Sequence, residues 1–186
     1  MSTVVRGGFE TISFAYMNIG ATHMLCMAER TDEGQLYNLI SCIIFCAFTL
    51  EAYFNHLGAI KYDDWIKEER SLSKLKKYTK FCKDLNVSYD FNVRPYSTLT
   101  EVFRFRDTMA HGKTSVDEIE KEMEIELDKV NYFSAGAEWK EYATLANAKK
   151  ALNDVHELIK ELHQSENLGN DPFNTTGGGF FAISHT

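Results

Sequence analysis

The sequence predicts an all-α fold, an up-and-down bundle of five or six helices, and two observations predict it. Apolar residues recur every three to four positions through several long segments, which is the period of a helix with one buried face. The 186 residues include only two prolines, Pro95 and Pro172, and neither interrupts a long periodic segment. Because proline breaks the helical hydrogen-bond ladder, this placement favours long helices. The length fits one domain with a sizeable core.

Three helices are expected in the first half of the chain. The first covers residues 9–30, and Gly20 inside it is expected at a close packing point, because a helical glycine costs about 1 kcal/mol relative to alanine. The second covers residues 34–58, with Thr31 or Asp32 as its cap, and it is the most apolar segment, so we place it at the centre of the bundle. The third is a shorter, basic helix over residues 71–86.

The second half of the chain contains two capping-box patterns. Thr98 and Glu101 predict a helix from there to about Ala110, with Gly112 as its left-handed terminator. The same spacing at residues 115–118 predicts an acidic helix to about residue 130, before a loop over residues 131–137. A last long helix is predicted over residues 138–164. Residues 1–164 thus form one helical domain, and residues 165–186 form an irregular, glycine-rich tail.

The apolar second segment has to be compared with a membrane span. No charged residue lies between Gly34 and Glu51, but a spanning helix needs about 20 predominantly apolar residues, and polar residues dilute this shorter run. We therefore expect a buried core helix. The amino terminus has no apolar signal region, so we expect a cytoplasmic protein with reduced cysteines.

The net charge of −7 counts against a polyanionic partner, but the charge is unevenly distributed. Residues 61–83 hold eight lysines and arginines against four acids, whereas residues 117–128 hold seven acids against one lysine. The basic segment can compensate if it flanks a cleft, because neutralised phosphates supply most of the non-specific affinity for nucleic acid. We interpret the acidic run as a solvated helix face.

An arginine, an aspartate and a histidine lie together just before a glycine, at Arg106, Asp107 and His111. Five residues on a helix correspond to about 140° of rotation, so Arg106 and His111 diverge unless the helix stops before Gly112. If it stops there, the histidine can turn toward the arginine, and Asp107 can orient the imidazole. Together these groups would supply a fork for phosphate and a group that titrates near neutral pH. The alternative is a charged helix end, where the helix dipole alone favours His111.

The string Arg106-Asp-Thr-Met-Ala-His111 resembles the R-x4-6-H motif of the HEPN superfamily. The apolar stretch Phe48-Thr-Leu-Glu-Ala-Tyr-Phe-Asn55 is similar to the second long helix of many HEPN domains, where a glutamate and an asparagine point inward. In this chain those residues are Glu51 and Asn55. The resemblance covers roughly residues 9–164 and is one of pattern and helix order.

The resemblance implies a homodimer in which the motifs of both copies share one cleft. It also implies metal-independent endoribonuclease activity, in which the ribose 2′-hydroxyl attacks the adjacent phosphate and leaves a 2′,3′-cyclic phosphate end. Arg106 would bind the phosphate and His111 would transfer protons, while Asp107, Glu51 and Asn55 would support them. No cofactor and no metal site is expected.

The partners that follow are RNA, a second copy of the chain and a separate antitoxin or regulatory protein, because many HEPN proteins are toxins or defence proteins held inactive by a partner. No membrane partner is expected. Lys74 and Lys77 of the basic segment, with Lys113 after the motif, are the residues expected to bind RNA.

Two alternatives remain open. One is a non-catalytic helical interaction module, in which Arg106, Asp107 and His111 cap a helix and fix a dimer interface. The other is a HEPN-like scaffold that binds a nucleotide without cutting it.

Overall fold

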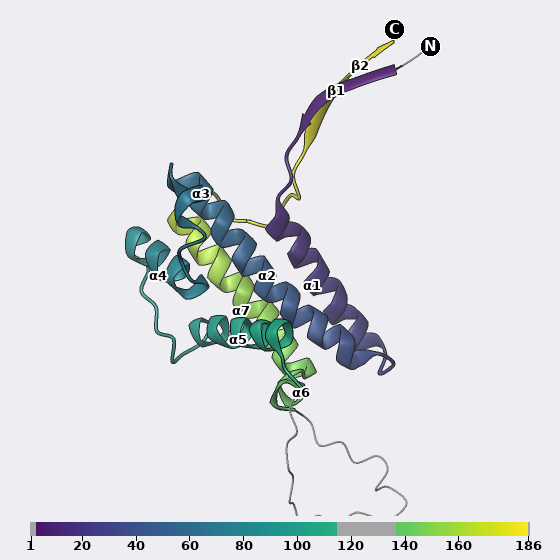
Figure 1. Ribbon diagram of the computed structural model, residues 1–186, viewed down its shortest axis with the longest axis vertical. Coiled ribbons are helices and arrows are strands. Elements are labelled where there is room, and N and C mark those ends of the chain that lie inside the picture. The colour runs from purple at the N-terminus through teal and green to yellow at the C-terminus, as the bar shows by residue number, and fades with distance from the viewer. Residues whose placement is uncertain (1–2, 115–136, 186) are drawn as a thin grey trace, which may run out of the picture.

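A computed structural model describes residues 3–114 and 137–185, and its described part is mostly helical, with one two-stranded sheet (Figure 1). The elements in chain order are β1 (Thr3–Phe9), α1 (Ser13–Arg30), α2 (Gln35–Lys61), α3 (Trp65–Glu68), α4 (Lys74–Leu85), α5 (Tyr96–His111), α6 (Glu138–Tyr142), α7 (Leu145–Ser165) and β2 (Gly179–His185). The predicted helical class is therefore confirmed for the described residues, and the two strands are an addition to it.

Helix α2 lies at the centre, as predicted, and packs against α1, α7 and α5. In the part of the chain that the structure describes, it is the one helix long and apolar enough to cross a membrane, with a mean hydropathy of 1.6. Its buried residues, such as Leu50 and Phe54, belong to the main core. The predicted cap at Thr31 or Asp32 is wrong, because the residue before the helix is Gly34, with a left-handed φ of 69°.

Two glycines mark close helix packing. A Cβ built on Gly20 would lie 3.2 Å from the ring of Phe45, so this position confirms the expected close contact between α1 and α2. Gly58 does not end α2, which continues to Lys61. A Cβ there would lie only 2.1 Å from the buried ring of Trp65, so the glycine admits the indole rather than breaking the helix.

The start of α5 differs from the capping box predicted at Thr98. The helix begins at Tyr96, two residues earlier, and Thr98 is buried inside its first turn. The Thr98 hydroxyl donates to the carboxylate of Asp154 on α7, at 2.5 Å, and Arg94 donates to both oxygens of the same carboxylate, at 2.9 and 2.6 Å. A tertiary contact therefore uses the hydroxyl that was expected to cap the helix.

The last predicted helix is divided in two. A short α6 ends at Tyr142, and α7 begins at Leu145 after Thr144, whose hydroxyl accepts a hydrogen bond from the Asn147 amide at 3.2 Å. The acidic helix predicted to about residue 130 lies outside the described residues, as does most of the loop predicted after it.

Both ends of the chain form an antiparallel ribbon that was not predicted. Only Phe9 of β1 lies in the predicted first helix, and the residues of β2 lie in the predicted irregular tail. In the structure Thr3 pairs with His185 and Phe9 with Gly179. The pairing continues to the bundle, where the Glu10 and Ile12 amides donate to carbonyls of residues 178 and 176. The ribbon extends away from the helices, beyond the amino-terminal end of α1 (Figure 1).

Candidate functional site

A hollow of about 770 Å³ lies where α2, α4 and α5 meet. Its lining includes most of the predicted supporting and RNA-binding residues: Glu51, Asn55, Lys74, Lys77 and Asp107. Segments far apart in sequence supply them, because α5 and α4 both pack on the half of α2 that carries Glu51 and Asn55.

Arg106 lies behind this lining, with 17% of its side chain exposed. Its guanidinium forms an ion pair with Glu51 and a second one with Asp107, at 2.8 Å. The guanidinium also lies 5.7 Å from the centre of the Phe48 ring, which is the spacing of a cation–π contact. Its Nε is buried and has no hydrogen-bond partner in the described residues. Arg106 is thus held in place, because two carboxylates accept hydrogen bonds from its guanidinium.

Asp107 bridges two cations. Its carboxylate accepts from Lys74 Nζ at 2.7 and 3.0 Å as well as from Arg106. Partial burial raises the pKa of Asp107, but the hydrogen bonds and charges of Lys74 and Arg106 act in the opposite direction and bring the pKa below its ordinary value. The two cationic neighbours therefore favour the ionised form of the carboxylate. The predicted role of orienting His111 has no counterpart here, since no bond joins the two side chains within the described residues.

Helix α4 places two lysines in the hollow. The Ser73 hydroxyl accepts from the Lys76 amide at 3.3 Å and caps the helix, so Lys74 and Lys77 lie one turn apart on the same face. Lys77 is 6% exposed and donates to the Asn55 side-chain oxygen at 2.7 Å. Burial lowers the pKa of Lys77, and nearby glutamates only partly oppose the shift. Asn55 thus has Lys77 as its hydrogen-bond partner, a contact that the sequence analysis did not predict.

His111 is the last residue of α5 and its side chain is exposed. Among the residues that the structure describes, it has no hydrogen-bond or ion-pair partner. The helix ends at His111, directly before Gly112, but His111 itself still belongs to the helix. The predicted left-handed terminator is wrong, because Gly112 has a φ of −56°. A Cβ on Gly112 would lie 2.8 Å from the Thr108 carbonyl oxygen, so glycine is needed for close approach instead. His111 consequently keeps its helical position, about 140° around the axis from Arg106.

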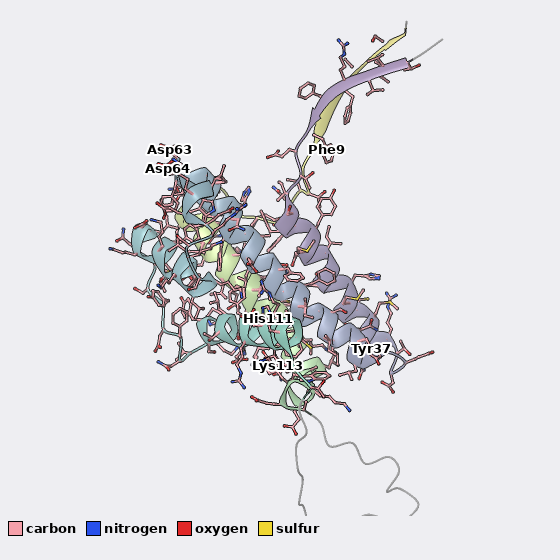
Figure 2. All side chains as sticks on the ribbon, in the orientation of Figure 1. Phe9, Tyr37, Asp63, Asp64, His111 and Lys113 are labelled. Carbon is pink, nitrogen blue, oxygen red and sulfur yellow. The ribbon has the colours of Figure 1, made fainter. Side chains whose placement is uncertain are left out.

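Lys113 is not part of the hollow. It is exposed beyond the end of α5, near His111 (Figure 2), and contributes to a second hollow beside α6, whose lining includes Phe105 and Trp139. The main hollow instead contains Arg70 and Arg104, which the sequence analysis did not select. Arg104 could have been found, because it is three residues before Asp107 and therefore shares its helix face.

The charge of the hollow is opposite to that of the whole chain. Counting Arg106 behind the lining and Glu138, which pairs with Arg104 from outside it, five cations (Arg70, Lys74, Lys77, Arg104, Arg106) meet four carboxylates (Glu51, Glu69, Asp107, Glu138). A locally positive cavity with lysine ammoniums at its wall can bind an anionic group such as phosphate.

Comparison of the chain with models of known protein families, with curated proteins and with solved structures gave no match.

Proposed function

We propose that this protein is a HEPN-like, metal-independent endoribonuclease that binds RNA phosphates in the hollow and is completed by a second copy. The single observation that carries the proposal is the set of contacts that Arg106 makes with Glu51 and Asp107. These contacts join the motif arginine to Glu51 of the Phe48–Asn55 stretch, beside Lys74 and Lys77, which are two of the three lysines expected to bind RNA.

The lysines would bind first. Lys74 and Lys77 line the hollow, and a phosphate there would compete with Asp107 for the Lys74 ammonium. Displacing Asp107 would also release one side of the Arg106 fork, which could then stabilise the charge that develops on the phosphate oxygens.

The proton-transfer group would come from the second copy. Within one chain His111 points away from Arg106 and is free at the surface, so it is available to a neighbouring molecule rather than to its own arginine. Arg106 of one copy and His111 of the other would form one site, and the twofold symmetry of a dimer would form two. The reaction would leave a 2′,3′-cyclic phosphate on one fragment and a 5′-hydroxyl on the other.

A second candidate is a HEPN-like domain that binds RNA or nucleotide without cutting it. It is favoured by the two carboxylates on Arg106, because a guanidinium that is already paired offers less to a transition state. In either form we place the protein in the cytoplasm, as a toxin or defence protein restrained by a separate regulatory chain.

The test is incubation of the purified protein with RNA in EDTA. We expect cleavage products with 2′,3′-cyclic phosphate ends and a loss of cleavage in His111→Ala. His23→Ala is the matched control, because His23 is also exposed but lies on α1. RNA binding without cleavage would support the second candidate, and equal cleavage by both variants would place the activity elsewhere.

A further inference from the structure

The ribbon has one apolar face and one more polar face. Cross-strand partners point to the same side, so the register places Val5 with Ile183, Gly7 with Phe181 and Phe9 with Gly179 on one face, and Thr3 with His185 at the outer end of that face. We call the four large residues Val5, Phe9, Phe181 and Ile183 the apolar face. The opposite face carries Val4, Arg6, Phe180, Ala182 and Ser184.

The apolar face is exposed along its whole length. Val5 is 57% exposed, Ile183 65%, and Phe9 and Phe181 61% each. The ribbon leads away from the bundle, with Phe9 near its base (Figure 2), so a partner can reach this face without meeting the helices. A two-stranded ribbon is marginally stable alone in water, and packing on an apolar face is one way to stabilise it.

Glycines leave room for the two phenylalanine rings of this face. A Cβ on Gly7 would lie 2.7 Å from the Phe181 ring, and a Cβ on Gly179 would lie 2.7 Å from the Phe9 ring. Each ring therefore lies over the backbone of the opposite strand. Apolar sheet faces can pack on each other about 10 Å apart.

The charge pattern of the ribbon favours a second copy of this chain as the partner. The two strands contain one charged residue other than histidine, Arg6, and it lies on the opposite face. Two copies can therefore bring their apolar faces together without burying a described charge, whereas a charged partner would find nothing to pair with. A twofold contact of this kind uses the same patch on both copies.

The area fits a reversible contact. An aromatic side chain such as Phe9 or Phe181 offers about 150–250 Å², and the aliphatic Val5 and Ile183 offer less. Because all four are more than half exposed, they present on the order of 400 Å² per copy. Two copies would bury roughly 800 Å² in all, which is below the size of permanent interfaces and suits a concentration-dependent association.

We propose that the apolar face of the ribbon packs on the same face of a second copy. The ribbon points away from α5 and α6 (Figure 1), so this contact is separate from the composite site and does not depend on the proposed nuclease activity.

The test uses two neighbouring valines that point to opposite faces. The average molar mass of the full chain would be measured by analytical ultracentrifugation over a range of concentrations for wild type, Val5→Lys and Val4→Lys. Both variants place a lysine in the same strand, so both disturb the pairing of the ribbon similarly. We expect Val5→Lys to weaken association by about tenfold or more, because a buried lysine is costly, and Val4→Lys to follow wild type. Ile183→Lys and Ser184→Lys repeat the comparison on β2.

Three results would overturn the proposal. One is an equal mass for wild type and Val5→Lys at every concentration, which would place any association on another surface. The second is an equal loss in Val4→Lys and Val5→Lys. The third is a monomeric wild type that floats with neutral phosphatidylcholine vesicles, which would assign the face to a lipid surface. The loss or absence of the ribbon contact alone would leave the RNA cleavage expected of the α5 site unaffected. A wild type that stays monomeric at every concentration would also contradict the second copy that the composite site needs, and the cleavage assay distinguishes the two cases.

Discussion

At the scale of single residues, Glu51 and Asp107 control the charge that the hollow presents. Both contact Arg106, and both line the cavity that Lys74 and Lys77 also line. The sequence identified these residues, because the motif and the Phe48–Asn55 stretch select them. It did not show that Glu51 pairs with the arginine, since these two residues lie on different helices and are 55 positions apart in the sequence.

Replacing Glu51 with glutamine removes one negative charge next to Arg106 while keeping the side-chain shape. We expect RNA to bind about threefold to tenfold more tightly at low salt, because one more cation is free to neutralise phosphate. Fluorescence anisotropy with a labelled oligonucleotide would measure it. Glu29→Gln is the control, because it makes the same change in an exposed ion pair with Lys149. Equal affinities for the two variants would show that Glu51 does not limit access to the arginine.

At the scale of elements, the sequence located the long helices α1, α2, α4, α5 and α7 but not where they begin, and it did not predict α3. For α5 the predicted apolar spacing was right, but the predicted cap was wrong. The Thr98 hydroxyl donates a hydrogen bond to Asp154 of α7 and therefore does not cap the helix. The ribbon was missed for a related reason: its glycines and exposed phenylalanines give no helical or buried-strand period, and its pairing partner lies at the other end of the chain.

Asp154→Asn tests how α5 is held at its first turn. The carboxylate is 1% exposed and accepts three hydrogen bonds, two from Arg94 and one from Thr98. We expect the variant to lose about 1–3 kcal/mol of unfolding free energy in urea titrations, because a neutral amide cannot accept all three. Asp64→Asn should change it by less than about 0.5 kcal/mol, since its pair with Lys67 is exposed. A similar loss of unfolding free energy in both variants would contradict the role of the Asp154 carboxylate in holding the first turn of α5.

Gly58→Ala and Gly20→Ala form a second matched pair. Both positions are helical, and alanine gains about 1 kcal/mol of helix propensity at each. The added Cβ at Gly58 meets the buried Trp65 ring, whereas at Gly20 it meets Phe45 at 3.2 Å. We expect a loss of about 1–3 kcal/mol of stability for Gly58→Ala and a change near zero for Gly20→Ala. Thermal unfolding that ranks the variants the other way would contradict the packing described for α3.

At the scale of the whole molecule, a group of histidines joins the bundle to the segment that leads to β2. His156 lies against Phe173 and bonds to Asn18 of α1, and His163 bonds to Tyr53 of α2. Burial lowers the pKa of both histidines below the ordinary value of 6.5. The fold therefore favours their neutral forms.

This arrangement predicts a stability that falls in mild acid. Because the folded-state pKa values lie below those of the unfolded chain, the unfolded state takes up protons first, and the stability present above pH 6.5 is lost as the pH falls through the folded-state values. Urea midpoints measured from pH 7.5 to pH 5 would test it. His156→Gln should flatten the dependence, since glutamine can still bond Asn18 without titrating. A midpoint that is constant or rises toward pH 5 would contradict the prediction.

The central claim is that Arg106 of one copy works with His111 of another. Mixing Arg106→Ala with His111→Ala, each inactive alone, tests it most directly. In a mixed dimer one site has both residues and the other has neither, so an equal mixture should recover about one quarter of wild-type RNA cleavage in EDTA. Recovery would show that the two residues act across copies. A mixture as inactive as either variant, under conditions where mixed dimers form, would contradict the composite site.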